Sequence, residues 1–289
     1  MSRVLVLGAS GQVGQAVLQS ATTGTDFIAP TKAEVDLRNT NQLRAYVLDV
    51  KPDAVINCAA YTRVDDAERE SDAAYLLNAE AAGIVAEATS LLDARFVHVS
   101  TDYVFDGNGL APYSVDALVA PQSVYGASKL KGEQLVALAN PAAAIVRTAW
   151  VHSGGDNNFV ATAVRIFQQQ KVMHVVDDQV STPTRALHLA SALWTFVARA
   201  NLGGVFHFTD AGVASWYDVA QCVLDTMQRD GLREPKTAVV PVATVEFPRP
   251  AARPRVSLLD KHATWKALDI APQHWRVGVA ASTREMTHA

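Results

Sequence analysis

The sequence predicts an α/β fold, in which a doubly wound parallel sheet is joined to a smaller α/β part. Short apolar runs recur in the first half of the chain, at residues 4–7, 54–60 and 96–100, and a segment with helical periodicity follows each of them. Such runs are typical of strands that are buried on both faces of a parallel sheet. The first run leads directly into a turn with three glycines and then a helix. This order of strand, glycine turn and helix is Rossmann-like.

The composition excludes several kinds of partner. Of 289 residues, 49% are hydrophobic and 19% are charged, and the net charge of −4 is spread without a block of like charges. We therefore expect no nucleic-acid partner and no membrane partner, but a small polar molecule. No apolar run approaches the ~20 residues of a membrane span, and the N-terminal run is too short for a signal peptide.

The cysteines and histidines indicate a reducing compartment and no metal site. Cys58 and Cys222 both lie in apolar segments, where we expect buried thiols and no disulfide framework. The eight histidines form no His-x3-His pair, and there is no Cys-x2-Cys pair. We therefore predict a cytoplasmic protein and no bound metal.

The glycine turn predicts a dinucleotide site. Its glycines allow a sharp turn and a close approach of the pyrophosphate, and the helix N-terminus offers free N–H groups and a positive dipole. The spacing is Gly-x2-Gly-x2-Gly, and a purely structural turn is the alternative. The residues expected in this site are Gly8, Ser10, Gly11, Gln12, Val13 and Gly14.

The second expected strand, residues 27–29, bears on the choice of cofactor. In NAD-binding folds an acidic residue at the end of this strand holds the adenosine ribose. Here Pro30, Thr31 and Lys32 follow the strand, so no carboxylate repels a 2′-phosphate and Lys32 can pair with one. This favours NADPH and permits NADH. The alternative is that Lys32 is a solvated loop charge.

The alternation of helices and strands continues beyond this point. A helix at 41–50, capped by Asn39 or Thr40, leads to the strand at 54–60, whose small residues let a cofactor lie close to the backbone. Ser71 is expected to cap a long helix that runs to residue 91. Asn78 in this helix is interpreted as a plain polar residue and not a site residue, unless the first part of the chain is taken to be a cofactor-binding domain.

Three side chains near the end of the fourth expected strand form a candidate catalytic group. Thr101 follows the strand at 96–100, at the carboxyl edge where parallel sheets bind ligands. After a loop at 110–123, a helix from about 124 to 139 carries Tyr125 and Lys129, which share one face because they are four residues apart. A nearby cation makes a phenol a better acid at neutral pH. Taken alone, Tyr125 as a core residue and Lys129 as a solvated charge would be the better interpretation.

The chain after a strand at 142–148 is expected to shape the substrate site. Trp150 ends that strand and can pack or wall a sugar or base. We divide the chain into a dinucleotide-binding domain, residues 1–150, and a substrate-binding domain, residues 151–289, with an approximate boundary and interleaved packing. Helices are expected at 159–170, 185–199 and 215–229, and strands at 172–176 and 205–208. Residues 231–275 are rich in proline and loosely patterned.

Taken together, these motifs resemble the extended short-chain dehydrogenase/reductase family, and within it the reductases of dTDP-4-dehydrorhamnose. The resemblance spans nearly the whole chain. The segments that carry it are residues 100–107 (Ser-Thr-Asp-Tyr-Val-Phe-Asp-Gly), 124–126, 157–159, 178–184 and 215–216, with Arg253, Pro254 and Ser257.

The resemblance implies a reaction and a set of site residues. NADPH or NADH would deliver hydride to the C4 ketone of a dTDP-linked 6-deoxy sugar, in the last step of dTDP-L-rhamnose synthesis. Tyr125 would protonate the oxygen, Thr101 would hydrogen-bond the same oxygen, and Lys129 would lower the pKa of the phenol and hold the nicotinamide ribose. The cofactor would also be lined by Asp36, Leu37, Ala59, Ala60, Tyr61 and Thr62, and the substrate would contact Thr101, Asp102, Tyr125 and Trp150.

The resemblance also permits a homodimer. The C-terminal helix, with Arg284 and Glu285, has few of the acidic residues that some relatives use at a metal-linked dimer contact. Two further alternatives stay open at this point. One is a reductase or epimerase of another nucleotide sugar, and the other is a regulatory subunit that binds a dinucleotide without catalysis.

Overall fold

A parallel sheet of six strands forms the centre of the molecule, in the order β10-β5-β4-β3-β1-β2. The structure is a computed structural model, which describes residues 3–21, 24–233 and 237–287. Each neighbouring pair in this sheet is parallel. The strands are β1 (Arg3–Leu7), β2 (Asp26–Ile28), β3 (Ala54–Asn57), β4 (Arg95–Thr101), β5 (Ala144–Thr148) and β10 (Gly204–His207). The predicted doubly wound α/β fold is confirmed.

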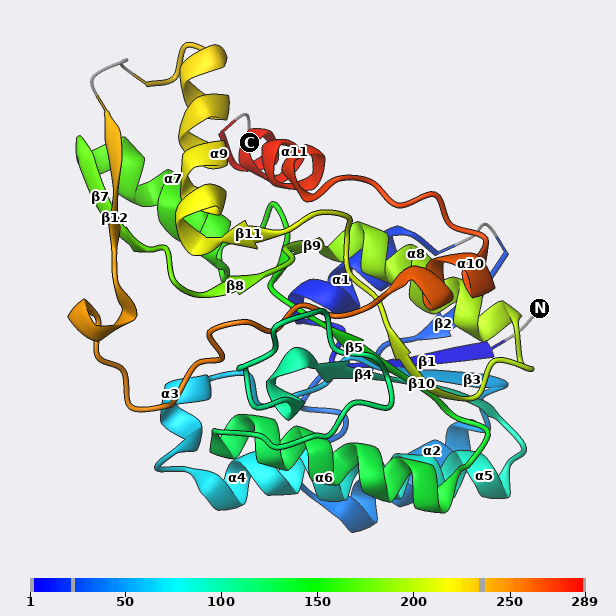
Figure 1. Cartoon of the computed structure of the whole chain (residues 1–289). Coiled ribbons are helices and arrows are strands. Elements are labelled where there is room, and N and C mark those ends of the chain that lie inside the picture. Colours follow the sequence, from blue (N-terminus) through cyan, green and yellow to red (C-terminus); the bar gives the residue numbers. More distant parts are fainter. Residues whose placement is uncertain (1–2, 22–23, 234–236, 288–289) are drawn as a thin grey trace.

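Helices cover both faces of the sheet, because its strands are apolar on both faces (Figure 1). Val4 and Val6 pack toward α1 (Gln12–Gln19) and α8 (Ala186–Ala198). Their neighbours Leu5 and Leu7 point to the opposite face. The helices on that face are α2 (Thr40–Val50), α5 (Ala81–Leu91) and α6 (Val124–Ala139).

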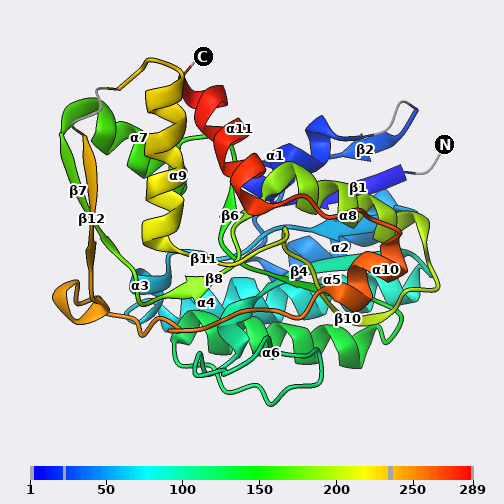
Figure 2. The ribbon, with the colours of Figure 1, turned by 45° about the horizontal axis from the view of Figure 1, so that its top comes forward.

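A second group of elements has its own core to one side of the sheet (Figure 2). Helices α7 (Phe159–Gln169), α9 (Trp216–Arg229) and α11 (Trp275–Thr287) pack with the parallel pair β7 (Val172–Val176) and β12 (Ala238–Val242). Two short pairs lie between this group and the sheet. They are β6 (Val151–His152) with β9 (Thr184–Arg185), and β8 (Val180–Ser181) with β11 (Ala214–Ser215).

The chain crosses between the two groups more than once. After residue 150 it builds part of the second core and then returns, so that α8 packs on the sheet and β10 pairs with β5. It crosses again to α9 and α11, with α10 (His262–Leu268) placed beside α8. A division of the chain at residue 150 stays a prediction, and segments from beyond residue 150 build one edge of the sheet.

Three local expectations are corrected. The strand expected at 54–60 ends at Asn57, and the long helix expected from Ser71 is α4 (Ser71–Tyr75), a π-helical turn (Leu76–Glu80) and α5. Ser71 is the first helical residue of α4 and makes no cap. The proline-rich residues 231–275 include β12 and α10. Cys222 is buried as expected, whereas Cys58 is only partly buried, and both thiols are free.

The π-helical turn lies where α6 approaches very closely. Gly132 of α6 lies against the backbone of Asn78. A Cβ atom on Gly132 would lie 2.1 Å from the Asn78 carbonyl oxygen. Single π-helical turns inside α-helices are rare and occur frequently at functional sites. Among the helices of the described ranges, we find none with the length and apolar character needed to cross a membrane.

We predict that Gly132→Ala destabilises the fold. The added methyl group must push the Asn78 backbone away, so we expect the free energy of unfolding in urea to fall by about 1–3 kcal/mol. Gln134→Ala, two residues along the same helix at an exposed position, is the matched control and should change it by less than about 0.5 kcal/mol. Equal stabilities of the two variants would contradict the close contact.

Candidate active site

The first turn of α6 brings Tyr125 to the carboxyl end of β4. Ser123 caps the helix, since its hydroxyl accepts a hydrogen bond from the Gly126 N–H at 3.2 Å. Gly126 lets the helix approach, because a Cβ atom there would lie 2.2 Å from the Tyr103 carbonyl oxygen. Tyr103 is only two residues after Thr101, so Thr101 and Tyr125 lie beside each other.

Thr101 is held at the last position of β4, with its side chain 5% exposed. Its hydroxyl accepts a hydrogen bond from the Tyr103 N–H and donates one to the Asp102 carboxylate, each at 3.2 Å. These contacts fix the hydroxyl at the edge where the glycine turn also lies.

Tyr125 is a phenol with a high pKa. Burial raises the pKa of Tyr125 to about 12, and the Thr101 hydroxyl offsets part of this rise. The ring of Tyr103 packs edge-on against it, with centroids 5.5 Å apart. At neutral pH the phenol therefore carries its proton and can donate it. We predicted that Lys129 lowers the pKa of Tyr125. Among the described residues, the groups that act on this pKa are Thr101 and Asp102, and burial raises it.

Lys129 is buried one turn further along α6, with 2% of its surface exposed. Its ammonium nitrogen donates to the Val99 carbonyl oxygen at 2.7 Å and lies 3.4 Å from Nε2 of His98. Burial lowers the pKa of Lys129 to about 8, against an opposing effect of the Glu133 carboxylate. The structure thus places Lys129 on the same helix face as Tyr125 but ties its amine to β4.

A buried ion pair lies beneath these residues. The Arg147 guanidinium on β5 donates to both oxygens of Glu133 on α6, at 2.7 Å and 2.9 Å. The Ser100 hydroxyl donates to the same carboxylate at 2.6 Å, and Arg147 also donates to the Val115 carbonyl oxygen at 3.3 Å. The pair therefore joins α6 to β4, to β5 and to the loop that follows Thr101 in the chain.

The glycine turn fits a phosphate at one of its three glycines. Gly8 has φ +77°, and a Cβ atom there would lie 2.5 Å from the Ala59 nitrogen; at Gly14 it would lie 2.3 Å from the Gly8 carbonyl oxygen. These two glycines allow the turn and the packing of α1 against it. At Gly11 the nearest atom would be 3.4 Å away, and Gly11 caps α1 without a side-chain hydrogen bond. Exposed Ser10 and Gly11 therefore leave the first N–H groups of α1 accessible.

Asn78 organises the strand end that faces the turn. Its side chain accepts from the Tyr61 N–H at 2.7 Å and donates to the Tyr61 carbonyl oxygen at 3.2 Å and to the Ser128 hydroxyl at 2.9 Å. The segment with Ala59, Ala60, Tyr61 and Thr62 is thereby fixed to α6. From the sequence alone, this asparagine is a plain polar helix residue unless a cofactor domain is assumed, because its partners lie far from it in the chain.

Asp36 and its neighbours form the outer end of the expected cofactor site. Arg38 donates to both oxygens of Asp36, at 2.7 Å and 3.0 Å, and holds the pKa of that carboxyl down at about 2. Lys32 contributes to the same effect. Leu37 packs against the core with Ile28, and Val13 packs on the opposite face of the sheet. Arg38 is an exposed cation that the sequence analysis did not single out.

Asp102 is buried directly after Thr101, with 2% of its surface exposed. The Ser257 hydroxyl donates to its second oxygen at 2.5 Å. Burial nevertheless raises the pKa of Asp102 to about 6, against the hydrogen bonds from Ser257 and Thr101. Asp102 thus connects the carboxyl end of β4, where Thr101 lies, to a segment near the end of the chain.

Trp150 lies at the junction of the two groups of elements. It has φ +46°, which is strained for a residue with a bulky side chain, and its indole stacks on Trp216 with centroids 3.6 Å apart. The Trp216 indole N–H donates to the Gln179 amide oxygen at 3.2 Å. Because Thr148 pairs in register with Thr101, Trp150 starts from the same edge of the sheet.

Residues 251–257 fasten the second group of elements to the first. Arg253 donates to both oxygens of Asp65, at 2.6 Å and 2.8 Å, and the Ala251 N–H donates to one of them. Asp65 lies in the short helix α3 (Val64–Ala67), and nothing in its local sequence marks it as a partner of Arg253. We call residues 251–257 the C-terminal strap.

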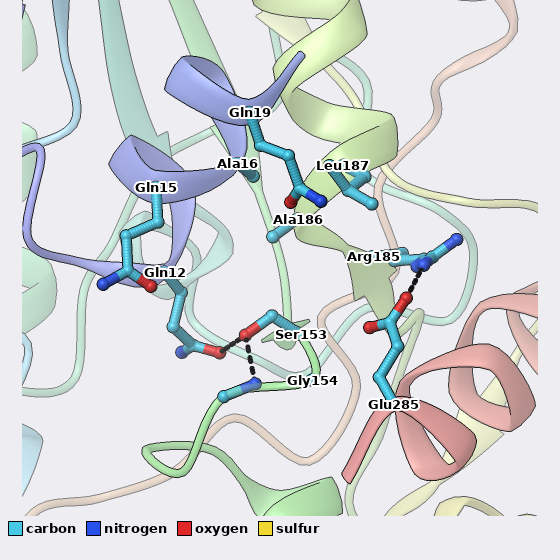
Figure 3. Close-up of a pocket in the computed structure, with 11 residues that line it drawn as sticks. Gln12, Gln15, Ala16, Gln19, Ser153, Gly154, Arg185, Ala186, Leu187 and Glu285 are labelled. Carbon is cyan, nitrogen blue, oxygen red and sulfur yellow. Dashed lines mark hydrogen bonds and ion pairs between the residues drawn. The ribbon is translucent and has the colours of Figure 1, made fainter. Parts of the chain in front are cut away.

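A second junction lies along α1 (Figure 3). The Gln12 amide oxygen accepts from the Ser153 hydroxyl and from the Asn158 amide, each at 3.0 Å, so its side chain connects α1 to residues 153–158. Beside it is a hollow of about 250 Å³, closed on the far side by the ion pair of Arg185 and Glu285. None of the predicted catalytic residues lines this hollow.

The fold and the site define the class: an extended short-chain dehydrogenase/reductase. The model of a family described as the RmlD substrate binding domain matches residues 2–288. The chain therefore belongs to the RmlD substrate binding domain family.

Named relatives and solved structures match nearly end to end. The chain is 40% identical over 287 residues to a dTDP-4-dehydrorhamnose reductase of Mycobacterium tuberculosis, with 97% of this chain and 92% of that protein covered. It is 38% identical over 277 residues to a probable dTDP-4,6-dihydroxy-2-methyloxan-3-one 4-ketoreductase of Streptomyces antibioticus, with 95% and 92% covered. A crystal structure of dTDP-4-dehydrorhamnose reductase from Bacillus anthracis in complex with NADP superimposes with a TM-score of 0.91 at 33% identity, covering 98% and 99%.

The raised pKa of Asp102 predicts a stability that depends on pH. The folded protein favours the neutral carboxyl, so this contribution is complete below the ordinary pKa of 3.8 and is lost as the pH rises through about 6. At about 1.4 kcal/mol per pKa unit, the buried carboxylate costs roughly 3 kcal/mol at neutral pH.

We therefore expect Asp102→Asn to remove most of the fall in unfolding free energy between pH 4 and pH 8. Urea unfolding at several pH values measures this, with Asp72→Asn at an exposed position as the control. A wild-type slope that survives in Asp102→Asn would contradict the assignment.

Proposed function

We propose that this protein is an NADPH-dependent reductase that converts dTDP-4-dehydro-L-rhamnose to dTDP-L-rhamnose, the last step of dTDP-rhamnose synthesis. The observation that carries this proposal is the placement of Thr101, Tyr125 and Lys129 at the sheet edge beside an open glycine turn. Relatives named for this reaction match the chain over nearly its full length, which supports the choice of substrate.

The residues around the glycine turn fit NADPH. The N–H groups at the start of α1 would hold the pyrophosphate, with Gly11 giving the space that it needs. Arg38 balances the charge of the Asp36 carboxylate, so the amine of Lys32 supplies the net positive charge that favours a 2′-phosphate at this end of the site. A TM-score of 0.91 to a structure that contains NADP supports the same choice.

The proposed reaction uses two donors on one oxygen. When bound, NADPH would supply the hydride that reduces the C4 carbon of the keto sugar. Tyr125 donates its phenolic proton to the C4 oxygen as negative charge develops there, and the Thr101 hydroxyl hydrogen-bonds the same oxygen. The single proton of the Thr101 hydroxyl goes to Asp102 here and would turn to the C4 oxygen when the substrate is bound, while the Tyr103 N–H continues to hold the hydroxyl oxygen in place.

Lys129, Asp102 and Trp150 complete the proposed site. The charge of Lys129 would favour the phenolate that forms when Tyr125 loses its proton. Asp102 would orient Thr101 and contact the substrate, and Trp150, stacked on Trp216, would wall the nucleotide sugar.

A second candidate function is the reduction of a different dTDP-linked keto sugar. The relative from Streptomyces antibioticus, a probable ketoreductase of such a compound, is 38% identical to this chain. Both functions use the same three residues, so they differ only in the pocket that holds the sugar. Comparing kcat/KM for dTDP-4-dehydro-L-rhamnose with kcat/KM for other dTDP-linked 4-keto sugars decides between them, and GDP- and UDP-linked 4-keto sugars test the choice of nucleotide.

The reaction itself is tested with Tyr125→Phe. Loss of the proton donor should lower kcat for NADPH oxidation by about 100- to 10,000-fold while the Kd for NADPH stays unchanged. NADPH absorbance with dTDP-4-dehydro-L-rhamnose measures the rate, and fluorescence titration measures binding. Tyr46→Phe, in α2, which covers the same face of the sheet but packs against α5 and not α6, is the control and should keep wild-type activity.

Two results would contradict the proposal. One is a wild-type protein that binds NADPH but oxidises it with none of the 4-keto sugars, which would favour the non-catalytic regulatory subunit. The other is an active Tyr125→Phe variant, which would remove Tyr125 from the reaction.

A further inference from the structure

A chain of buried polar atoms leads from β3 to the amine of Lys129. The Ala59 N–H donates to the side-chain oxygen of Asn57 at 3.0 Å, and the Asn57 amide nitrogen lies 3.2 Å from Nδ1 of His98. On the other side of the ring, Nε2 of His98 lies 3.4 Å from Nζ of Lys129. Asn57, His98 and Lys129 are 4%, 0% and 2% exposed, so water does not compete for these atoms.

The amide of Asn57 decides where His98 carries its proton. Because the amide oxygen accepts from the Ala59 N–H, the amide nitrogen must face the ring, and it can only donate. Nδ1 of His98 must therefore be the acceptor, without a proton. Burial holds the pKa of His98 well below its ordinary value, so the ring is neutral and its one proton sits on Nε2.

This proton points at Lys129. An ammonium group has three donors and no lone pair, so an ammonium at Nζ would set two donors against each other. A neutral amine has a lone pair that can accept from the Nε2–H while one of its own protons still goes to the Val99 carbonyl oxygen.

We propose that Asn57 and His98 are positioning residues for Lys129: the amide fixes the Nε2–H form of the imidazole, and this N–H favours the neutral amine over the ammonium. The catalytic role of Lys129 on which this rests is that of the proposed function. Lys129 is then a group that exchanges a proton near neutral pH and not a permanent cation. A pKa close to the working pH is the value at which proton exchange is most efficient.

Other titratable groups face Lys129 from the elements around it. Glu133 lies on α6 itself, and its carboxylate opposes the lowering of the Lys129 pKa but is paired with Arg147 of β5. Cys58, just after β3, interacts with Lys129, and burial raises the pKa of this thiol to about 12, so it is neutral. Tyr125, on the same helix, is neutral for the same reason. Within this set His98 is the group whose orientation acts directly on the Lys129 amine.

The first test is the protonation of His98 in the wild-type protein. Nitrogen-15 NMR of the imidazole, in protein without substrate, should show a protonated Nε2 and an unprotonated Nδ1. Protonation on Nδ1 would overturn the proposal. No variant is needed, so the result does not depend on the folding of a mutant.

The second test reverses the imidazole. In Asn57→Asp one carboxylate oxygen keeps the Ala59 N–H bond, and the other must accept a proton from Nδ1 of His98. The lone pair of Nε2 then faces Lys129 and, with the new charge, stabilises the ammonium. We expect the His98 proton to move to Nδ1 and the NMR titration midpoint of Lys129 to rise by about one pH unit or more. The Lys129 signal is assigned with Lys129→Arg.

The pH dependence of kcat/KM should shift in the same direction as the Lys129 titration, to higher pH. If the ammonium assists Tyr125, kcat/KM falls as the pH rises through the pKa of Lys129, and this fall should move to higher pH in Asn57→Asp. Asn140→Asp, which places a carboxylate at another buried asparagine beside Thr89, is the control and should leave His98 and Lys129 unchanged.

The outcomes separate this inference from the proposed function. An Asn57→Asp variant in which His98 keeps its Nε2 proton, or in which the proton moves but Lys129 titrates as before, would overturn the inference. Both NMR measurements are made without substrate, so a wrong substrate would abolish only the kinetic part.

Discussion

Two opposite charges are buried together beneath the proposed catalytic residues, Glu133 on α6 and Arg147 on β5, each with about 5% of its side chain exposed. Removing such charges from water costs several kcal/mol per ion, and only close geometry with additional hydrogen bonds offsets that cost. Here both carboxylate oxygens are bonded to the guanidinium, and Ser100 and Val115 satisfy further atoms. A shift of α6 along the sheet would leave an unpaired charge in the core. The register of Tyr125 and Lys129 against Thr101 is therefore set by this pair.

Small residues allow the close packing around the site, and polar contacts fix the neighbouring segments to it. Gly126 and Gly132 let α6 lie against the backbone of its neighbours, which brings the site together. Asn57 and Asn78 bond the backbone N–H groups of Ala59 and Tyr61. The second group of elements is fixed by Asp65 and Arg253, by Asp102 and Ser257, and by Gln12 with Ser153. Each contact joins a residue of the first 150 positions to one of the last 140. The two parts of the protein are thus connected by directional bonds as well as by apolar packing.

The sequence predicted what depends on local order and missed what depends on distant neighbours. The apolar runs 4–7 and 96–100 became central strands because buried parallel strands have a recognisable composition, and the glycine turn needed only its position between a strand and a helix. The placement of Thr101 beside Tyr125 also followed, from the rule that strand ends share one edge. The tie of Lys129 to β4 did not, because the spacing of Tyr125 and Lys129 says nothing about His98 or Val99. The strand β12 was missed since Pro241 weakens its pattern, and an edge position in a two-stranded pair tolerates that proline.

The C-terminal strap is synthesised much later than the residues that it contacts. Asp102 and its partner Ser257 are 155 positions apart, and Asp65 and Arg253 are 188 apart. At about 5–20 residues per second of synthesis, Asp102 waits roughly 8–30 seconds on the ribosome before Ser257 is made. During that interval the residues of the first five strands and of α6, with Thr101 and Tyr125 among them, are already made, whereas the partner of the Asp102 carboxylate is not. Thr101 and Tyr125 are therefore synthesised well before the C-terminal strap that holds Asp102.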